Sequence, residues 1–149
     1  YRFNTYDRCS ADKQNWKVSD GENHKLNATL NIKQYPTSVS QPKVVVGQVH
    51  GYNISQALIK LQWEGNNKPI RAIMNHTFSL NNEKCSNCSF SVNLGTVKAG
   101  VDWSYQIEVN KQGVILQAAG VKKSFAWGQT VENSGHALTP NWTDNSNSF

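Results

Sequence analysis

The chain has 149 residues, enough for one domain with a substantial core. Its apolar content of 38% suits a soluble protein, and no apolar run is long enough to span a bilayer, so we expect no membrane partner. Fifteen Lys and Arg against ten Asp and Glu give a net charge of +5, which fits ordinary solubility or attraction to a polyanion. Because the basic residues are dispersed and never run beyond a pair, we expect no nucleic-acid partner.

Asn and Ser are abundant, with 18 and 14 copies, and both residues favour turns and loops. This composition predicts many short strands joined by frequent reversals. The first residues, from Tyr1 onward, lack the apolar segment of a signal peptide. We therefore expect any leader to have been removed already.

Three cysteines are present, Cys9, Cys85 and Cys88. The C-x-x-C pair fits a redox motif, half of a zinc site or a local disulfide. Zinc needs two further ligands, and His76 is the only nearby candidate. A thioredoxin-type site needs a helix after the pair, where this sequence has a polar turn leading into an alternating segment. We favour a Cys85–Cys88 disulfide at a hairpin turn, in a secreted or periplasmic protein, with Cys9 free or paired outside the chain.

Apolar and polar residues alternate along most of the chain, which is the period of a strand with one buried face. In chain order, the predicted strands are residues 24–34, 43–49, 57–63, 70–78, 89–94, 103–110, 114–118 and 121–126. A short hairpin turn at residues 111–113 joins two of these strands.

No segment has a convincing helical period, and no internal repeat or linker is present. Residues 128–149 are polar and irregular, which predicts a long surface loop. About eight antiparallel strands with turn-rich connections predict an all-β fold, an antiparallel β-sandwich or jelly roll.

One predicted strand combines a run of valines with polar residues. On a regular strand, four of its side chains point the same way: Val44, Val46, Gln48 and His50. On the next strand Lys60 and Gln62 lie on the face opposite the apolar side chains. If the two polar faces are shared, Gln48, His50, Lys60 and Gln62 line one surface. The plainer alternative is a solvated strand face, but polar groups that follow valines in a central strand favour a site.

Four segments together resemble polysaccharide lyase family 7 and its close relatives, such as family 18. They are Asn-His-Lys-Leu-Asn-Ala-Thr-Leu at 23–30, Val-Val-Gly-Gln-Val-His-Gly at 45–51, Leu-Ile-Lys-Leu at 58–61 and Trp-Ser-Tyr-Gln-Ile-Glu-Val at 103–109. The resemblance covers residues 16–149, and the Gln-Val-His motif is its most informative part.

The resemblance implies a jelly roll whose concave sheet binds alginate, a polymer of mannuronate and guluronate, and cleaves it by β-elimination. Gln48 and an Arg would neutralise the uronate carboxylate, and His50 would assist or perform proton abstraction. Lys60, Gln62 and Tyr52 are the expected substrate-binding neighbours. The chemistry requires no cofactor and no metal, and we expect a monomer.

The chain departs from the family pattern near both ends. The family's Arg-Ser/Thr-Glu-Leu-Arg motif is matched only by Arg8. Either Arg8 is the motif arginine in a divergent motif, or the motif is expected upstream of Tyr1 and Arg8 is a surface residue beside Asp7 or Asp12. The family's Tyr, which acts as acid or as both acid and base, is expected after Phe149, because Lys98-Ala99-Gly100 precedes the strand that it should follow. We therefore expect residues 1–149 to form a single lyase-like domain that is incomplete at both ends.

Two other functions remain open from the sequence. A non-catalytic carbohydrate-binding module of the same sandwich class would use the Gln48, His50 and Lys60 face together with exposed Trp residues. A lyase for another uronan, such as glucuronan, would use the same chemistry with different pocket contacts.

Overall fold

The computed structural model describes residues 16–35, 38–52, 54–79 and 85–149. Eight strands lie in this part of the chain: β1 (His24–Asn31), β2 (Val44–His50), β3 (Ala57–Trp63), β4 (Pro69–Asn75), β5 (Ser89–Thr96), β6 (Asp102–Asn110), β7 (Gly113–Ala118) and β8 (Val121–Ala126). Two short 3-10 helices accompany them, η1 (Val18–Asp20) and η3 (Pro140–Thr143). No helix among the described residues is long and apolar enough to cross a membrane.

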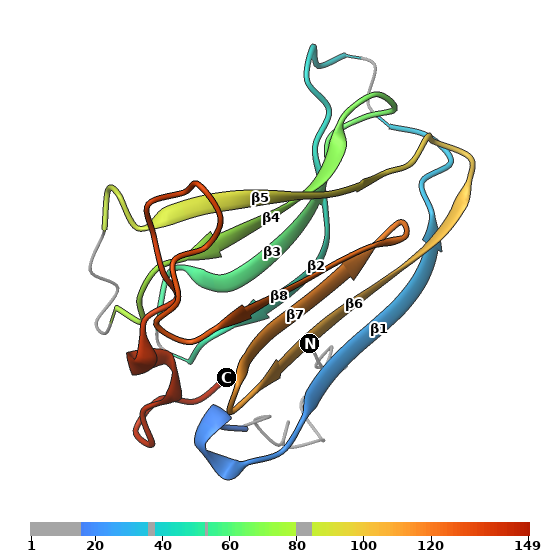
Figure 1. Cartoon of the computed structure of the whole chain (residues 1–149). Coiled ribbons are helices and arrows are strands. Elements are labelled where there is room, and N and C mark those ends of the chain that lie inside the picture. The colour runs from blue at the N-terminus through green and yellow to red at the C-terminus, as the bar shows by residue number, and fades with distance from the viewer. Residues whose placement is uncertain (1–15, 36–37, 53, 80–84) are drawn as a thin grey trace, which may run out of the picture.

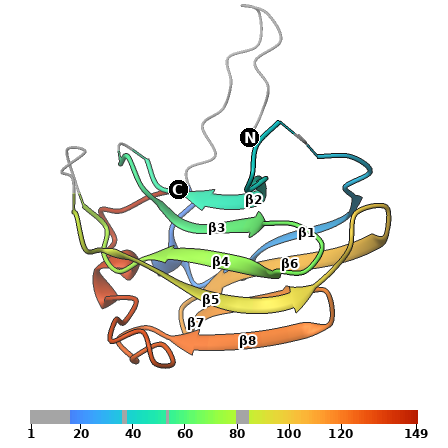
Figure 2. The ribbon, with the colours of Figure 1, turned by 90° about the horizontal axis from the view of Figure 1, so that it is seen from above.

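The strands form two four-stranded sheets that lie face to face as two layers (Figures 1 and 2). One sheet has the order β1-β6-β7-β8 and the other β2-β3-β4-β5. Every pairing is antiparallel. The prediction of an all-β antiparallel sandwich is therefore confirmed.

The core lies between the sheets and is built from the alternate apolar residues of each strand. From β3 it takes Ile59, Leu61 and Trp63, and from β6 it takes Trp103, Tyr105, Ile107 and Val109. The period of two places the polar residues between them on the outer faces. Consequently each sheet presents one polar face away from the core.

The strand boundaries differ from the predictions mainly at strand ends. β3 and β8 have the predicted limits, whereas β1 ends at Asn31, three residues early. β1 is an edge strand, and its Leu26 is 39% exposed although it lies on the core side of the sheet. The hairpin between β6 and β7 is present as predicted, with both turn amides, from Gln112 and Gly113, bound by the Asn110 side-chain oxygen.

The prediction that residues 128–149 form a surface loop is wrong. Four of its apolar side chains are buried: Val131, Leu138, Trp142 and Phe149. The Trp142 indole N–H donates to the Asn75 and His76 carbonyl oxygens at 3.1 and 3.2 Å. Phe149 stacks on Trp16 and donates its amide to the Trp16 carbonyl oxygen at 3.0 Å. The segment closes one end of the sandwich beside η1 (Figure 1).

Because Trp142 is fully buried, Trp142→Ala is expected to lower the free energy of unfolding by about 3–5 kcal/mol. Asn133→Ala is the control, since Asn133 is exposed in the same segment and its loss should cost less than about 0.5 kcal/mol. Urea unfolding of both variants measures the difference. Equal and small effects would mean that the segment does not belong to the core.

Candidate functional site

Gln48 and Lys60 are direct neighbours on adjacent strands. β2 pairs with β3 so that Gln48 lies opposite Lys60, and directly opposite residues of an antiparallel pair have Cβ atoms about 4.5–5.5 Å apart on one face. Both side chains are half-buried. They lie on the side of the β2-β3-β4-β5 sheet that points away from the core, called the Gln48 face below. The structure thus brings together this amide and this ammonium as predicted.

The face assignment along β2 needs one correction. Val44 lies opposite the buried Trp63, whereas Val45 lies opposite Gln62 and is 46% exposed. A bulge follows, because Gly47 is the next paired residue and Val46 has no partner on β3. Val44 therefore does not share a face with Gln48, since the additional residue reverses the alternation between them.

His50 lies at the end of β2 and is exposed. A second irregularity places it opposite Ala57. Its Nδ1 lies 2.9 Å from the Gly51 carbonyl oxygen. Because a carbonyl oxygen can only accept, Nδ1 must carry the hydrogen of this bond, and in the neutral ring Nε2 is then free to accept a proton.

Gln62 lies on the same side of β3 as Lys60, and its neighbour on β4 is Arg71. The Glu64 Oε1 atom accepts from the Gln62 amide at 2.5 Å and from the Arg71 Nη2 atom at 2.7 Å. The Gln62 amide nitrogen is therefore already occupied by a protein partner. The predicted role of Gln62 in substrate binding stays a prediction.

Arg71 is a functional candidate that the sequence analysis missed. Its side chain is 35% exposed on the Gln48 face, two residues from Ile73, which lies opposite Lys60. Its Nε atom is shielded from solvent and has no hydrogen-bond partner among the described residues. The available signal was the alternation Ile70-Arg71-Ala72, which places a cation between two core residues.

Two other candidates lie elsewhere in the chain. β2 ends at His50, so strand alternation does not determine the direction of the Tyr52 side chain. The Tyr52 backbone N–H donates to the Ser148 carbonyl oxygen at 2.8 Å. The placement of Tyr52 in the groove stays a prediction. Arg8, like Cys9, lies outside the described residues.

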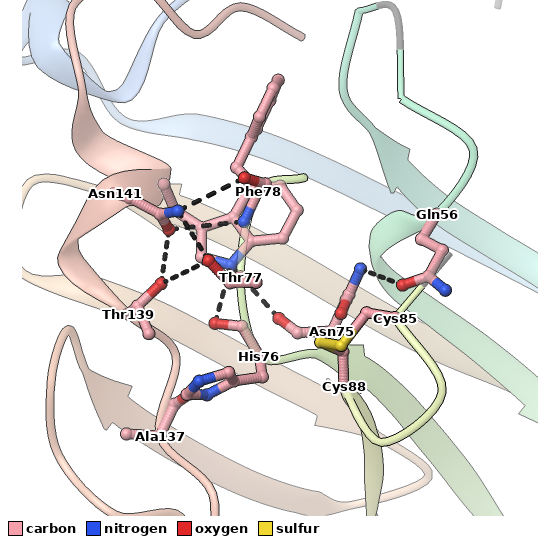
Figure 3. The surroundings of a disulfide bond; sticks show 11 residues. Gln56, Asn75, His76, Thr77, Phe78, Cys85, Cys88, Ala137, Thr139 and Asn141 are labelled. Carbon is pink, nitrogen blue, oxygen red and sulfur yellow. Dashed lines mark hydrogen bonds between the residues drawn. A yellow bond between two sulfur atoms is a disulfide. The ribbon is translucent and has the colours of Figure 1, made fainter. Parts of the chain in front are cut away.

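The predicted disulfide between Cys85 and Cys88 is present, with the two Cα atoms 5.4 Å apart (Figure 3). It closes the turn before β5, and the Cys88 carbonyl oxygen accepts from the His76 amide at 2.7 Å. Figure 3 also shows the polar network of Thr77, Thr139 and Asn141 beside it. The disulfide thus tightens the connection that joins β4 to β5.

A hollow of about 370 Å³ lies on the outer face of the other sheet. Its lining comprises Asn27, Ala28, Thr29, Ser104, Tyr105, Gln106 and Gln117. None of these residues is charged, so the hollow offers no cation to a carboxylate. The Gln48 face, with Lys60 and Arg71, has the better charge for an acidic ligand.

Metal-binding potential is low in the part of the chain described by the structure. No three His, Cys, Asp or Glu side chains come together there as ligands. The Gln48 face carries the amides of Gln48 and Gln62, the Lys60 ammonium, the Arg71 guanidinium and the Glu64 carboxylate, a set that suits an anionic ligand better than a cation.

The chain is a two-sheet antiparallel sandwich with cationic and amide donors on one outer face. The family model described as alginate lyase matches residues 1–149, and the chain belongs to this family. No curated protein gave a match.

Solved structures show the same fold. Alginate lyase PA1167 from Pseudomonas aeruginosa has a TM-score of 0.62 at 21% identity, over 87% of this chain and 52% of that one. Alginate lyase A1-II', a member of polysaccharide lyase family 7, has a TM-score of 0.58 at 16% identity, over 75% and 46%. Alginate lyase AlyC3 has a TM-score of 0.61 at 13% identity, over 91% and 58%. The chain spans about half the length of these structures.

The Arg71–Glu64 pair is expected to be coupled. Glu64 is only 11% exposed, so Arg71→Ala leaves a poorly solvated carboxylate, and the double variant Glu64→Ala/Arg71→Ala should lose less stability than the two single losses combined. We expect a coupling of about 1 kcal/mol in urea unfolding. The Lys123–Glu132 pair, with side chains 26% and 42% exposed, is the control and should show less coupling. Strict additivity at Arg71 and Glu64 would contradict this account.

Proposed function

We propose that this protein is an alginate lyase that cleaves a uronate polymer by β-elimination on the Gln48 face. The observation that carries the proposal is the direct cross-strand pairing of Gln48 with Lys60, two residues along β2 from an exposed His50 whose Nδ1 is bound by the Gly51 carbonyl oxygen. Membership of the alginate lyase family supports the choice of substrate.

The negative charge of the substrate carboxylate is the first obstacle to proton abstraction. The C5 proton of a uronate becomes acidic only when the negative charge of the adjacent carboxylate is neutralised. The Gln48 amide would donate to a carboxylate oxygen, and the Lys60 ammonium would supply a positive charge beside it. Both groups also stabilise the charge that develops on the carboxylate as the proton leaves.

Proton abstraction is the second step. The His50 Nε2 atom would take the C5 proton, and the electron pair of the C5–H bond would form the C4=C5 double bond as the C4–O4 bond breaks. An acid must protonate the departing O4 oxygen, and the family resemblance assigns this role to a Tyr. The product carries a 4,5-unsaturated uronate at its new end.

Arg71 extends the cationic character of this face to a neighbouring subsite. It lies one strand beyond Gln62, further across the sheet from β2. A polyuronate carries a carboxylate on every residue, so a chain lying across the sheet would present further carboxylates to this guanidinium. Glu64 holds the guanidinium in place through Nη2.

The binding-module alternative expects Trp residues exposed for sugar stacking. Trp63, Trp103 and Trp142 are buried, with exposed fractions of 0%, 6% and 0%, and the other two, Trp16 and Trp127, are half-buried against the core. This burial favours an enzyme over a module that grips sugar with Trp. A lyase for another uronan such as glucuronan differs only in pocket contacts, so a panel of polymers is part of the test.

We also propose an exported location, secreted or periplasmic. The Cys85–Cys88 disulfide supports it, because disulfides persist in oxidising compartments and are rare in reducing ones.

The reaction is tested by incubating the full-length protein with alginate, polymannuronate, polyguluronate and glucuronan. Cleavage should raise the ultraviolet absorbance of the conjugated double bond. His50→Ala should lower kcat about 100-fold or more, within the range of general base catalysis, while His24→Ala on β1 should leave it unchanged. On polymannuronate, a partial loss of kcat in His50→Ala would fit a reaction in which Tyr also acts as a base. No absorbance rise on any polymer would exclude the proposed function.

The charge role of Lys60 is tested by a matched pair of variants. Lys60→Met and Lys122→Met remove the same charge from opposite sheets, since Lys122 is exposed on β8. Lys60→Met should raise KM or lower kcat about 10-fold, and Lys122→Met should change neither by more than about 2-fold, because distant exposed charges are screened by salt. Equal changes of KM and kcat in the two variants would mean that only the net charge of the protein affects the reaction.

A further inference from the structure

Whether Gln48 reaches the substrate depends on the bulge in β2. Val44 points into the core opposite Trp63. With strict alternation from Val44, Gln48 would also point into the core. The extra residue, Val46, reverses the alternation and turns Gln48 outward beside Lys60. A catalytic position thus depends on one unpaired residue.

The facing sheet supplies a partner for this unpaired residue. Tyr105 of β6 is 6% exposed, and its hydroxyl donates to the Val46 carbonyl oxygen at 2.8 Å. Val46 has no register partner on β3, and this hydrogen bond ties its carbonyl oxygen to the facing sheet. Burial also raises the pKa of the Tyr105 phenol, so the hydroxyl keeps its proton at neutral pH.

Gly47 makes room for the Tyr105 ring. A Cβ atom at Gly47 would lie 2.6 Å from the Tyr105 hydroxyl oxygen and 2.8 Å from two ring carbons. Only a residue without a side chain allows the ring to approach β2 so closely. Gly47 and Tyr105 therefore form a complementary pair on two sheets, directly beneath Gln48.

We propose that Tyr105 is a positioning residue of the active site, which fixes the Val46 bulge and so directs Gln48 toward the substrate. This inference rests on the proposed function and deepens it by assigning a role to a residue on the opposite sheet. A plain core residue in this place would contribute packing alone. A positioning role and a packing role predict different effects on kcat when the Tyr105 hydroxyl group is removed.

The first test compares Tyr105→Phe with Trp127→Phe in the full-length protein. Each change removes one hydrogen bond from a side chain to a backbone carbonyl, since Trp127 donates to the Asn110 oxygen at 2.9 Å at the end of the sheet that also holds Tyr105. Both should lower Tm by a few degrees. Tyr105→Phe should in addition lower kcat about 10- to 100-fold with KM changed less than about 3-fold, because a small misplacement of a catalytic group has that effect.

The second test concerns the pair itself. Gly47→Ala should lower both Tm and kcat, because its Cβ displaces the ring. In Gly47→Ala/Tyr105→Leu the ring is gone, so the Tm loss should be smaller than the combined single losses while kcat stays low.

The dependence of the free energy of unfolding on alkaline pH is a further test of the Tyr105 hydroxyl. Since its folded pKa is raised, the wild type should lose stability above about pH 10 more steeply than Tyr105→Phe.

The signal of the Gln48 side-chain amide in an NMR spectrum separates this inference from the proposed function. It should shift in Tyr105→Phe and stay in place in Trp127→Phe, whether or not the protein cleaves alginate. An inactive wild type whose Gln48 signal shifts in this way would overturn the proposed function and leave the bulge assignment standing. An active Tyr105→Phe with wild-type kcat and an unmoved Gln48 signal would overturn the positioning role.

Discussion

The apolar layer between the two sheets fixes the direction of the side chains on the regular parts of the strands. Because successive residues of a strand point to opposite faces, burying Ile59, Leu61 and Trp63 obliges Lys60 and Gln62 to point outward. The candidate site is therefore a consequence of core packing. A site built in this way inherits the rigidity of the sheet, which suits chemistry that depends on the placement of donors.

The Gln48 face also carries the Glu64 carboxylate, which reduces its positive charge and binds two of its donors. Glu64 binds both Gln62 and Arg71, which lie on different strands. A free arginine would lose more conformational entropy on meeting a substrate than one already held in place. The same carboxylate weakens the positive potential of the face. Such a balance favours release as well as binding, which the proposed reaction needs because its charged product must leave.

The sequence predicted the strands and the central pair of the site, for identifiable reasons. The segment around Leu61 alternates without interruption, so β3 has the predicted limits and Lys60 the predicted face. The bulge at Val46 was beyond prediction, because three consecutive valines fit either phase of a strand. The prediction of a surface loop at residues 128–149 was wrong for another reason. Leu138 and Trp142 are buried by contacts with residues distant in sequence, and the segment has no local hydrophobic period. Arg71 was predictable from its neighbours and was missed.

The contacts between the two ends of the described chain affect how the protein folds. The Lys17 ammonium donates to the Asn145 carbonyl oxygen across 128 residues of sequence, and the Trp16–Phe149 stack lies beside it. Contacts of such long range form late, because the intervening chain loses much of its entropy before they can form. During synthesis β1 cannot pair until β6 has left the ribosome, and the Trp16–Phe149 stack cannot form until Phe149 has done so. Folding after release, in the compartment where Cys85 and Cys88 can oxidise, would shorten the time that β1 stays unpaired.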